Sequence, residues 1–146
     1  MDSDDVRVQI YRSFVETGRP PMPVDLAAAG GLPLSEVEEA LRDLARQDVI
    51  ALIPGTSFVW LAHPFSAAAG PFRVVSSDRT WDAICIWDAL GILALVESDG
   101  RVEARCPDCG DRLTVEVRAG AVAAPDGYVA HYGIPASRWY EDVGYT

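Results

Sequence analysis

Residues 80–92, TWDAICIWDALGI, constrain the fold most, because this segment is apolar almost all the way round. Trp81, Cys85 and Asp88 recur at helical spacing, so the segment is predicted to be a helix. A helix with apolar residues on every side is expected to be largely buried. A carboxylate in such a helix is costly to bury. The segment therefore predicts a core helix with Cys85 and Asp88 on one face.

Two interpretations of Cys85 and Asp88 follow from this pattern. Burial disfavours the charged form of a carboxylate, so Asp88 would tend to hold a proton beside the thiol and could donate or accept it. Alternatively, Cys85 is an inert core residue and Asp88 caps a neighbouring loop, since free cysteines are commonly buried for packing. The pattern alone favours packing.

The chain is large enough for a real core, with 146 residues of which 49% are hydrophobic. No run of about eighteen uncharged apolar residues is present, so no membrane-spanning helix is expected. The N-terminus, MDSDDVRVQ, is acidic and lacks the basic and apolar regions of a secretory signal. We therefore expect a soluble, cytoplasmic protein that does not act at a membrane.

The charge balance bears on possible partners. Twelve arginines and no lysine stand against twenty-two acidic residues, for a formal net charge of −10. This balance argues against non-specific affinity for nucleic acid or anionic lipid. Three cysteines in a chain expected to be intracellular are better interpreted as thiols or metal ligands than as a disulfide framework.

The first 65 residues are predicted to form a winged-helix-like N-terminal domain. Helices are expected at 6–17, at 23–29 and from Leu34 onward, with Ser35 as the N-cap of the third. Two strands, 49–53 and 57–62, flank a Pro-Gly turn and predict a hairpin. Three helices followed by a hairpin is the order of a winged helix.

DNA binding is disfavoured for this domain. The expected groove-reading helix carries four acidic residues against two arginines on its surface. Such a helix needs cations for phosphates and donors for guanine. We therefore favour a structural or docking role for the domain, and we expect no nucleic-acid partner.

Residues 66–146 are predicted to form a second domain, a small mixed sheet packed on the helix at 80–94. Strands are expected at 72–75, 101–106 and 112–119, and 128–133 is a further candidate strand. A last helical turn, with Ser137 as a possible cap, is expected near the C-terminus. The fold class is therefore α+β.

The sequence CPDCG at 106–110 is a tight turn holding two sulfurs. Such a turn is common as half of a zinc site, and a complete site needs four ligands. The other candidate ligands, Cys85, His63 and His131, show no ligand-pair spacing, so both histidines are interpreted as surface or core residues. A redox role would need a thioredoxin-like βαβ pattern, which is missing. The alternative is a turn whose cysteines pack or bind metal adventitiously.

Taken together, these residues resemble the organomercurial (alkylmercury) lyases. The similarity rests on W-x-x-x-C-x-x-D-A-L-G at 81–91, on the cysteine-bearing turn CPDCG and on the closing HYGIPASRWYEDVGYT. The resemblance implies protonolysis of a carbon–mercury bond to a hydrocarbon and Hg(II). It implies that Cys85 binds mercury as a thiolate and that Asp88 relays the proton.

The resemblance also bears on cofactors and on the other cysteines. Cys106 and Cys109 would be structural or would assist metal transfer. No organic cofactor is implied, and low-molecular-weight thiols would remove Hg(II) from the site. The family uses a second catalytic cysteine soon after a segment like RWYEDVGYT, and no cysteine follows Cys109 here. Either the native protein continues to that thiol, or Cys106 or Cys109 replaces it, or the protein binds mercury without efficient cleavage.

Two other hypotheses remain open at this point. The chain could be a non-catalytic soft-metal-binding or sensor protein that uses the CPDCG turn and a winged helix. It could also be a catalytically inactive relative of the lyases that serves as an interaction domain.

Overall fold

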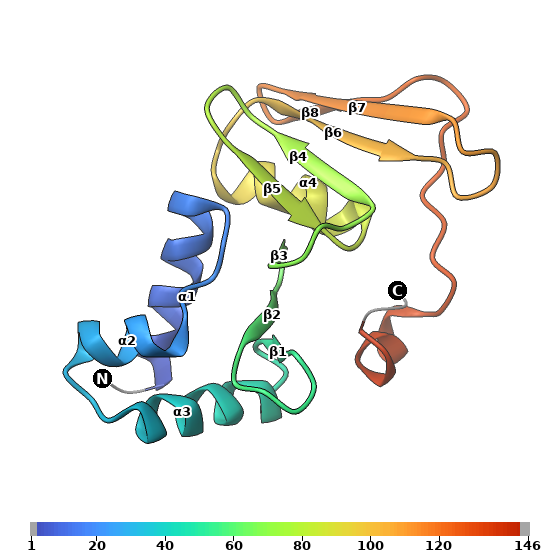
Figure 1. Ribbon diagram of the computed structural model, residues 1–146. Helices are drawn as coiled ribbons and strands as arrows, with labels where there is room; N and C mark the ends of the chain where they lie inside the picture. The colour runs from blue at the N-terminus through green and yellow to red at the C-terminus, as the bar shows by residue number, and fades with distance from the viewer. Residues whose placement is uncertain (1–2, 144–146) are drawn as a thin grey trace. The chain divides into compact units, whose positions relative to one another are not determined.

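The computed structural model describes residues 3–143 and divides the chain into two compact units, Met1–His63 and Pro64–Thr146 (Figure 1). Each unit contains helices and antiparallel strands, so the chain has the predicted α+β class. None of the helices in the described part has the length and hydropathy needed to span a bilayer.

The N-terminal unit has its elements in the predicted order. They are α1 (Ser3–Thr17), α2 (Pro23–Gly30), α3 (Leu34–Arg46), β1 (Ala51–Leu52) and β2 (Val59–Ala62). The two strands pair antiparallel, with Ala51 opposite Leu61. That this unit is a winged helix stays a prediction.

The core of this unit comes from helical spacing in α1 and α3. The buried side chains are Val6, Ile10 and Phe14 of α1 and Val37, Leu41 and Leu44 of α3. These positions recur every three or four residues and so lie on one face of each helix. Burial of each such side chain stabilises the fold by roughly 1.5–3 kcal/mol before entropy is counted.

The start of α3 differs from the prediction. Pro33 is the N-cap residue, with φ −58° and ψ 140°, and it makes no side-chain capping bond. Ser35 therefore lies inside the first turn, because the helix begins at Leu34. The fixed φ of proline suits the entry to a helix, and this local preference outweighs the capping tendency of serine.

The C-terminal unit is an antiparallel sheet with one α-helix. Its strands are β3 (Phe65–Ser66), β4 (Phe72–Val75), β5 (Thr80–Ala83), β6 (Gly100–Arg105), β7 (Arg112–Arg118) and β8 (Ala121–Ala123). They are ordered β3-β5-β4-β6-β7-β8. The helix α4 (Ile86–Leu95) packs on β3 to β6, and Figure 1 shows it behind β4 and β5. A sheet packed on this helix is the predicted arrangement, but the strand pairs described are antiparallel and not the mixed sheet that was expected.

The segment 80–92 is not one helix, which corrects the first expectation. Residues Thr80–Ala83 form β5, and α4 begins only at Ile86. Trp81 pairs with Val74 of β4 and is buried, so the apolar side chains of 81 and 83 alternate with Asp82 in strand fashion. Sequence periodicity could not separate a short apolar strand from the first turn of a buried helix.

Three smaller expectations also change. The helix α4 is not covered on every side, since Trp87 is 68% exposed. Residues 128–133 form no strand. The last turn is a 3-10 helix, Ala136–Glu141, whose N-cap is Pro135 and not Ser137. The short strands β3 and β8 were not predicted, because two or three residues carry no readable alternation.

Candidate functional site

Cys85 occupies the N-cap of α4, between the end of β5 and the first helical residue. Its backbone is extended, with φ −140° and ψ 166°. Its sulfur accepts a hydrogen bond from the backbone N–H of Asp88, with N to Sγ at 3.3 Å. The first amides of a helix have no partner within the helix, so the thiol sits where an electron-rich acceptor is favoured.

Asp88 lies in the first turn of α4 and is buried, with 8% of its surface exposed. It shares the inward face of α4 with Ala89 and Ile92, which are fully buried. A carboxylate in the first turn is favoured by the helix dipole, which offsets part of the cost of its burial. The structure therefore brings Cys85 and Asp88 together, as their spacing of three residues predicts.

The surroundings of Cys85 hold its thiol in the neutral form. Burial raises the pKa of Cys85 to about 11. The amide of Asp88 acts in the opposite direction, while the charge and side-chain hydrogen bond of Asp88 raise the pKa further. At neutral pH this site is a thiol beside a buried carboxyl group.

Tyr132 is a neighbour of this pair that sequence reasoning did not identify. Burial raises the pKa of its phenol, and the charges of Cys85 and Asp88 add to that effect, which places Tyr132 near both. Its ring lies 5.5 Å from that of Trp139, whose indole N–H donates to the carbonyl of Ile134 at 3.1 Å. The only available signal was its place in the closing HYGIPASRWYEDVGYT segment, because no local pattern links residue 132 to α4.

An apolar cavity of about 320 Å³ lies between α4 and the segment that precedes Tyr132. Its lining includes Phe72, Ile86, Leu90, Leu113, Tyr128 and His131. Ile86 directly follows Cys85 and His131 directly precedes Tyr132, while Cys85 and Asp88 themselves are not part of the lining. His131, which the sequence left without a role, therefore borders this space.

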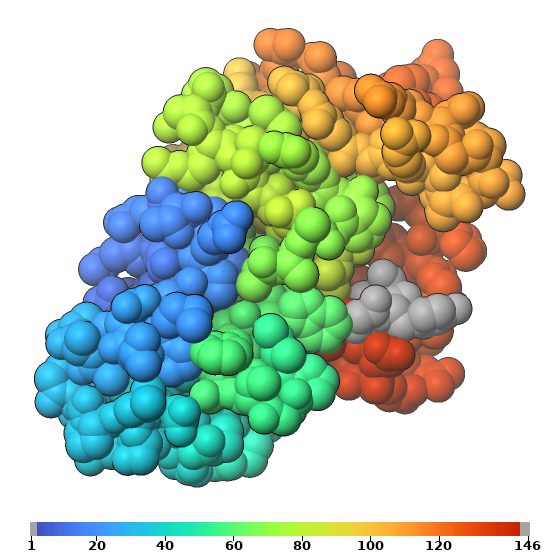
Figure 2. Space-filling model, in the orientation of Figure 1, coloured from blue at the N-terminus to red at the C-terminus, as the bar shows by residue number. Residues whose placement is uncertain are grey.

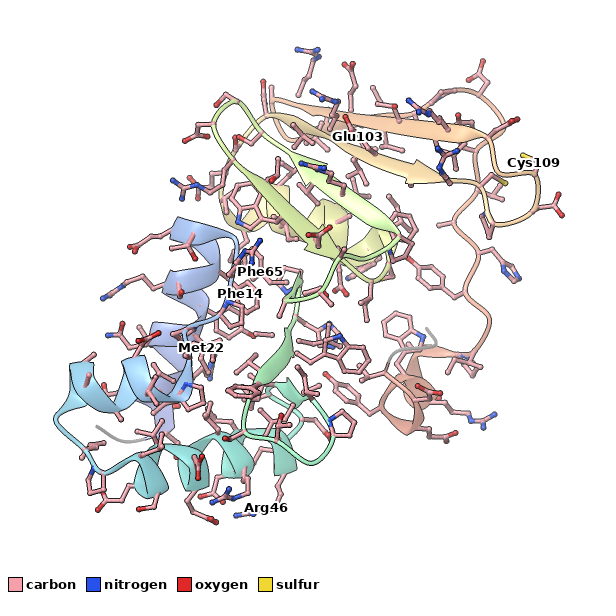
Figure 3. The ribbon with its side chains drawn as sticks, in the orientation of Figure 1. Phe14, Met22, Arg46, Phe65, Glu103 and Cys109 are labelled. Atoms are coloured by element: carbon pink, nitrogen blue, oxygen red, sulfur yellow. The ribbon has the colours of Figure 1, made fainter. Side chains whose placement is uncertain are left out.

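Cys106 and Cys109 lie in the turn between β6 and β7. The N–H of Cys106 donates to the carbonyl of Asp111 at 2.8 Å, and the N–H of Gly110 donates to the carbonyl of Cys106 at 2.9 Å. Both cysteines are free thiols, and a hydrogen bond joins their side chains. Cys109 lies at the outer edge of the turn (Figure 3).

The two thiols of this turn differ in acidity. Hydrogen bonds from the backbone amide of Cys109, and then from that of Asp108, lower the pKa of Cys106. The amide of Asp111 lowers the pKa of Cys109, but side-chain hydrogen bonds with Cys106 and Asp111, together with burial and the charge of Asp111, raise it overall.

The three cysteines do not form one metal site. Among residues 3–143, no three His, Cys, Asp or Glu side chains lie together in a way that could hold a metal ion. Cys85, Cys106 and Cys109 therefore do not act as three ligands of one ion in this structure. His63 belongs to the N-terminal unit, where its carbonyl accepts a hydrogen bond from Tyr11 Oη at 3.0 Å.

Comparison with known proteins bears on the C-terminal unit above all. Residues 65–146 match the family model described as MerB, alkylmercury lyase. No curated protein matches the chain. Among solved structures, the mercury-bound form of MerB2 is similar with a TM-score of 0.63 and 20% sequence identity.

That similarity covers 83% of this chain and 57% of the MerB2 chain, so this chain spans little more than half of its structural relative. At this level of identity the likeness shows a shared fold. The family match independently covers β3 to the C-terminus, and it includes Cys85, Asp88 and the CPDCG turn.

Proposed function

The chain belongs to the alkylmercury lyase family, and from that membership we propose that it binds an organomercurial at Cys85 and cleaves the carbon–mercury bond with a proton relayed by Asp88. One observation carries this proposal. The sulfur of Cys85 lies 3.3 Å from the amide nitrogen of Asp88, whose carboxyl group is buried beside it.

The first step is a ligand exchange at mercury: the Cys85 sulfur replaces the external thiolate that the organomercury group carries in solution, and the Cys85 thiol gives up its proton. Mercury is soft and prefers thiolate ligands. Because the pKa of Cys85 is about 11, its thiol must lose a proton as the sulfur–mercury bond forms. The carboxylate of Asp88 is the adjacent base that takes this proton, so no net charge is created in the buried site.

The second step returns that proton to the organic group. The protonated Asp88 donates to the carbon bound to mercury as the carbon–mercury bond breaks. The electron pair of that bond becomes the new carbon–hydrogen bond, and no atom is oxidised or reduced. The hydrocarbon leaves, Asp88 is again a carboxylate, and Hg(II) stays on the sulfur until external thiols remove it.

The neighbouring cavity suits the organic group of the substrate. Its lining is mainly aliphatic and aromatic, and its volume of about 320 Å³ is in the range of small-ligand pockets. An apolar wall also limits water near the carbon centre. Ile86 and Leu90 of α4 contribute to this wall, and Ile86 is the residue that follows Cys85.

The decisive experiment is to incubate the protein with methylmercury or phenylmercury and excess thiol, and to measure methane or benzene. The proposal expects hydrocarbon release that disappears in Cys85→Ser. Asp88→Asn is expected to keep mercury binding but to slow release by about 10²–10⁴-fold, the usual contribution of a positioned acid.

The matched control for the aspartate is Asp78→Asn. Asp78 is an exposed carboxylate in the turn between β4 and β5, where it accepts a hydrogen bond from Ser77. This variant changes net charge by the same amount and is expected to release hydrocarbon at the unchanged rate. Stoichiometric mercury binding without any hydrocarbon from the unaltered protein would overturn the catalytic proposal.

A further inference from the structure

We propose that the CPDCG turn, residues 106–110, is a second and separate mercury site, in which the sulfurs of Cys106 and Cys109 chelate one Hg(II) ion. This site goes beyond the proposed lyase chemistry, because it takes the inorganic ion and needs neither Cys85 nor Asp88.

The turn holds its two sulfurs on a closed, paired scaffold. Arg105 of β6 pairs with Arg112 of β7 at the base of the turn. Within it, the N–H of Cys106 bonds to the carbonyl of Asp111, and the N–H of Gly110 bonds back to the carbonyl of Cys106. The guanidinium of Arg105 donates to the carbonyl of Gly110 at 3.2 Å. These bonds fix the backbone that carries both thiols before any ion arrives.

Backbone amides also point at the sulfurs. The amides of Asp108 and Cys109 hydrogen-bond to the Cys106 sulfur, and the amide of Asp111 to the Cys109 sulfur. Gly110 permits this path with φ +78°, a conformation that side-chain-bearing residues rarely adopt.

The two sulfurs are close to each other and open to solvent. A hydrogen bond joins the two thiols, so both lie on the same side of the turn. Cys109 is exposed and Cys106 is half-buried. Figure 2 shows the β6–β7 region, in orange, at the surface on this face of the molecule. A soft ion can therefore reach both ligands without opening the core.

The chemistry is a simple exchange of protons for metal. Hg(II) forms one bond to each sulfur, each thiol releases its proton to the buffer, and no electron is transferred. Two thiolates on one turn act as a chelate, since the second sulfur binds at high effective concentration once the first is attached. Soft thiolate ligands suit a soft d¹⁰ ion such as Hg(II).

The test uses the pre-reduced full chain with Cys85→Ser, so that only the turn can supply a cysteine pair. Inorganic Hg(II) is added in the presence of a competing monothiol. Binding is followed by thiolate-to-mercury absorption in the ultraviolet and by native mass spectrometry. We expect one tightly held mercury per chain, with a mass that shows the loss of both thiol protons.

The comparison variants are Cys106→Ser and Cys109→Ser, each in the Cys85→Ser background. Either change should weaken retention of Hg(II) by about 100-fold or more, since the chelate is lost. Circular dichroism checks that each variant is folded. Equal retention by the single-cysteine variants would overturn the proposal. A mercury ion that links two chains, seen as a dimer by native mass spectrometry, would overturn it as well.

This outcome is separable from the lyase assay. A protein that releases no hydrocarbon from phenylmercury but holds one Hg(II) at the turn supports this site and removes the lyase proposal. If the unaltered protein releases hydrocarbon but the Cys85→Ser variant does not hold Hg(II), the lyase proposal is supported and the site at the turn is ruled out.

Discussion

Cys85 is an unusual N-cap, because helix N-caps are most often Ser, Thr, Asp or Asn. Its sulfur makes the capping bond to the amide of Asp88 that an oxygen would normally make. Sulfur is a weaker acceptor than oxygen. The choice of cysteine here therefore adds little to stability, which is what would be expected if the residue serves chemistry.

The capping bond of Cys85 predicts how two substitutions at residue 85 change the stability of the protein. Cys85→Ser keeps an acceptor at the cap and is expected to leave the free energy of unfolding unchanged or slightly higher. Cys85→Ala removes the acceptor and should lower it by about 1 kcal/mol. Urea unfolding followed by circular dichroism measures both. If serine destabilises as much as alanine, the capping bond does not contribute.

The raised pKa of Cys85 predicts a distinct pH profile for its alkylation. Only the thiolate reacts, so the rate should climb about tenfold per pH unit and level off near pH 11, above the ordinary thiol value of 9.0. The protein for this measurement carries Cys106→Ser and Cys109→Ser, so that Cys85 is the single thiol. Iodoacetamide labelling followed by mass spectrometry gives the rate.

Asp88→Asn supplies the control for that profile. The negative charge of Asp88 raises the pKa of Cys85, so removing that charge should move the alkylation profile to lower pH. The expected shift is partial, since burial is the larger cause. If the alkylation rate of Cys85 levels off near the ordinary thiol pKa of 9.0 while Asp88 is present, the buried environment of Cys85 is contradicted.

At the scale of single residues, the sequence predicted contacts between residues that lie close together along the chain. Residues three apart at the start of a helix lie on one face, so the pairing of Cys85 with Asp88 was predictable. Tyr132 lies 44 residues from Asp88 along the chain, as their numbers show, and its approach depends on how the C-terminal segment folds. No local pattern could indicate it.

Among the elements, the junction of β5 and α4 decides where the site is. Trp81 and Ala83 pair with β4, and this pairing forces the chain to leave the sheet at Cys85 before α4 begins. A helix through the whole of 80–92 would have placed Cys85 in its middle, with its amide and carbonyl used within the helix. The strand places the thiol at a helix start, where free amides surround it.

Substitution by alanine is expected to have opposite effects on stability at two glycines of the C-terminal unit, Gly100 and Gly91. A Cβ at Gly100, at the start of β6, would lie 2.5 Å from the carbonyl oxygen of Val75 and 2.8 Å from Leu93 Cδ2. Gly100→Ala should therefore destabilise the protein by about 1–3 kcal/mol, the usual cost of overpacking. Thermal unfolding measures the change.

Gly91 is the matched control within α4. A Cβ there would meet Pro64 Cβ at 3.5 Å, an ordinary van der Waals contact. Alanine is the better helix former, so Gly91→Ala should raise stability by about 0.5–1 kcal/mol. A loss of stability at Gly91 equal to that at Gly100 would contradict the packing described here.

At the scale of the whole molecule, the boundary between the two compact units falls between His63 and Pro64 along the chain. The match to the family model begins at residue 65. We propose that Pro64–Thr146 carries the mercury chemistry and that the N-terminal unit is a structural or docking module. Every residue of both proposed mercury sites lies in the C-terminal unit. The N-terminal unit contributes no cysteine, since all three lie after residue 84.

The charge of the molecule predicts the absence of DNA binding. The net charge is −10, and on α3 Glu39 forms ion pairs with Arg42 at 3.0 Å and Arg46 at 3.1 Å. Both arginines of that helix are therefore held by a neighbouring acid. We expect no mobility shift of duplex DNA at low salt, where electrostatic binding is strongest. A shift that weakens steeply with added salt would contradict this.

The sequence by itself determined the α+β class, the hairpin that carries CPDCG and the adjacency of Cys85 and Asp88, because each depends on neighbours within a few residues. Only the tertiary structure decided that residues 80–83 are a strand, that Tyr132 approaches the Cys85–Asp88 pair and that, among the described residues, the three cysteines form no common metal site. These features depend on contacts between segments far apart in the chain, such as β5 with β4. Periodicity within one segment carries no information about which distant segment will cover it.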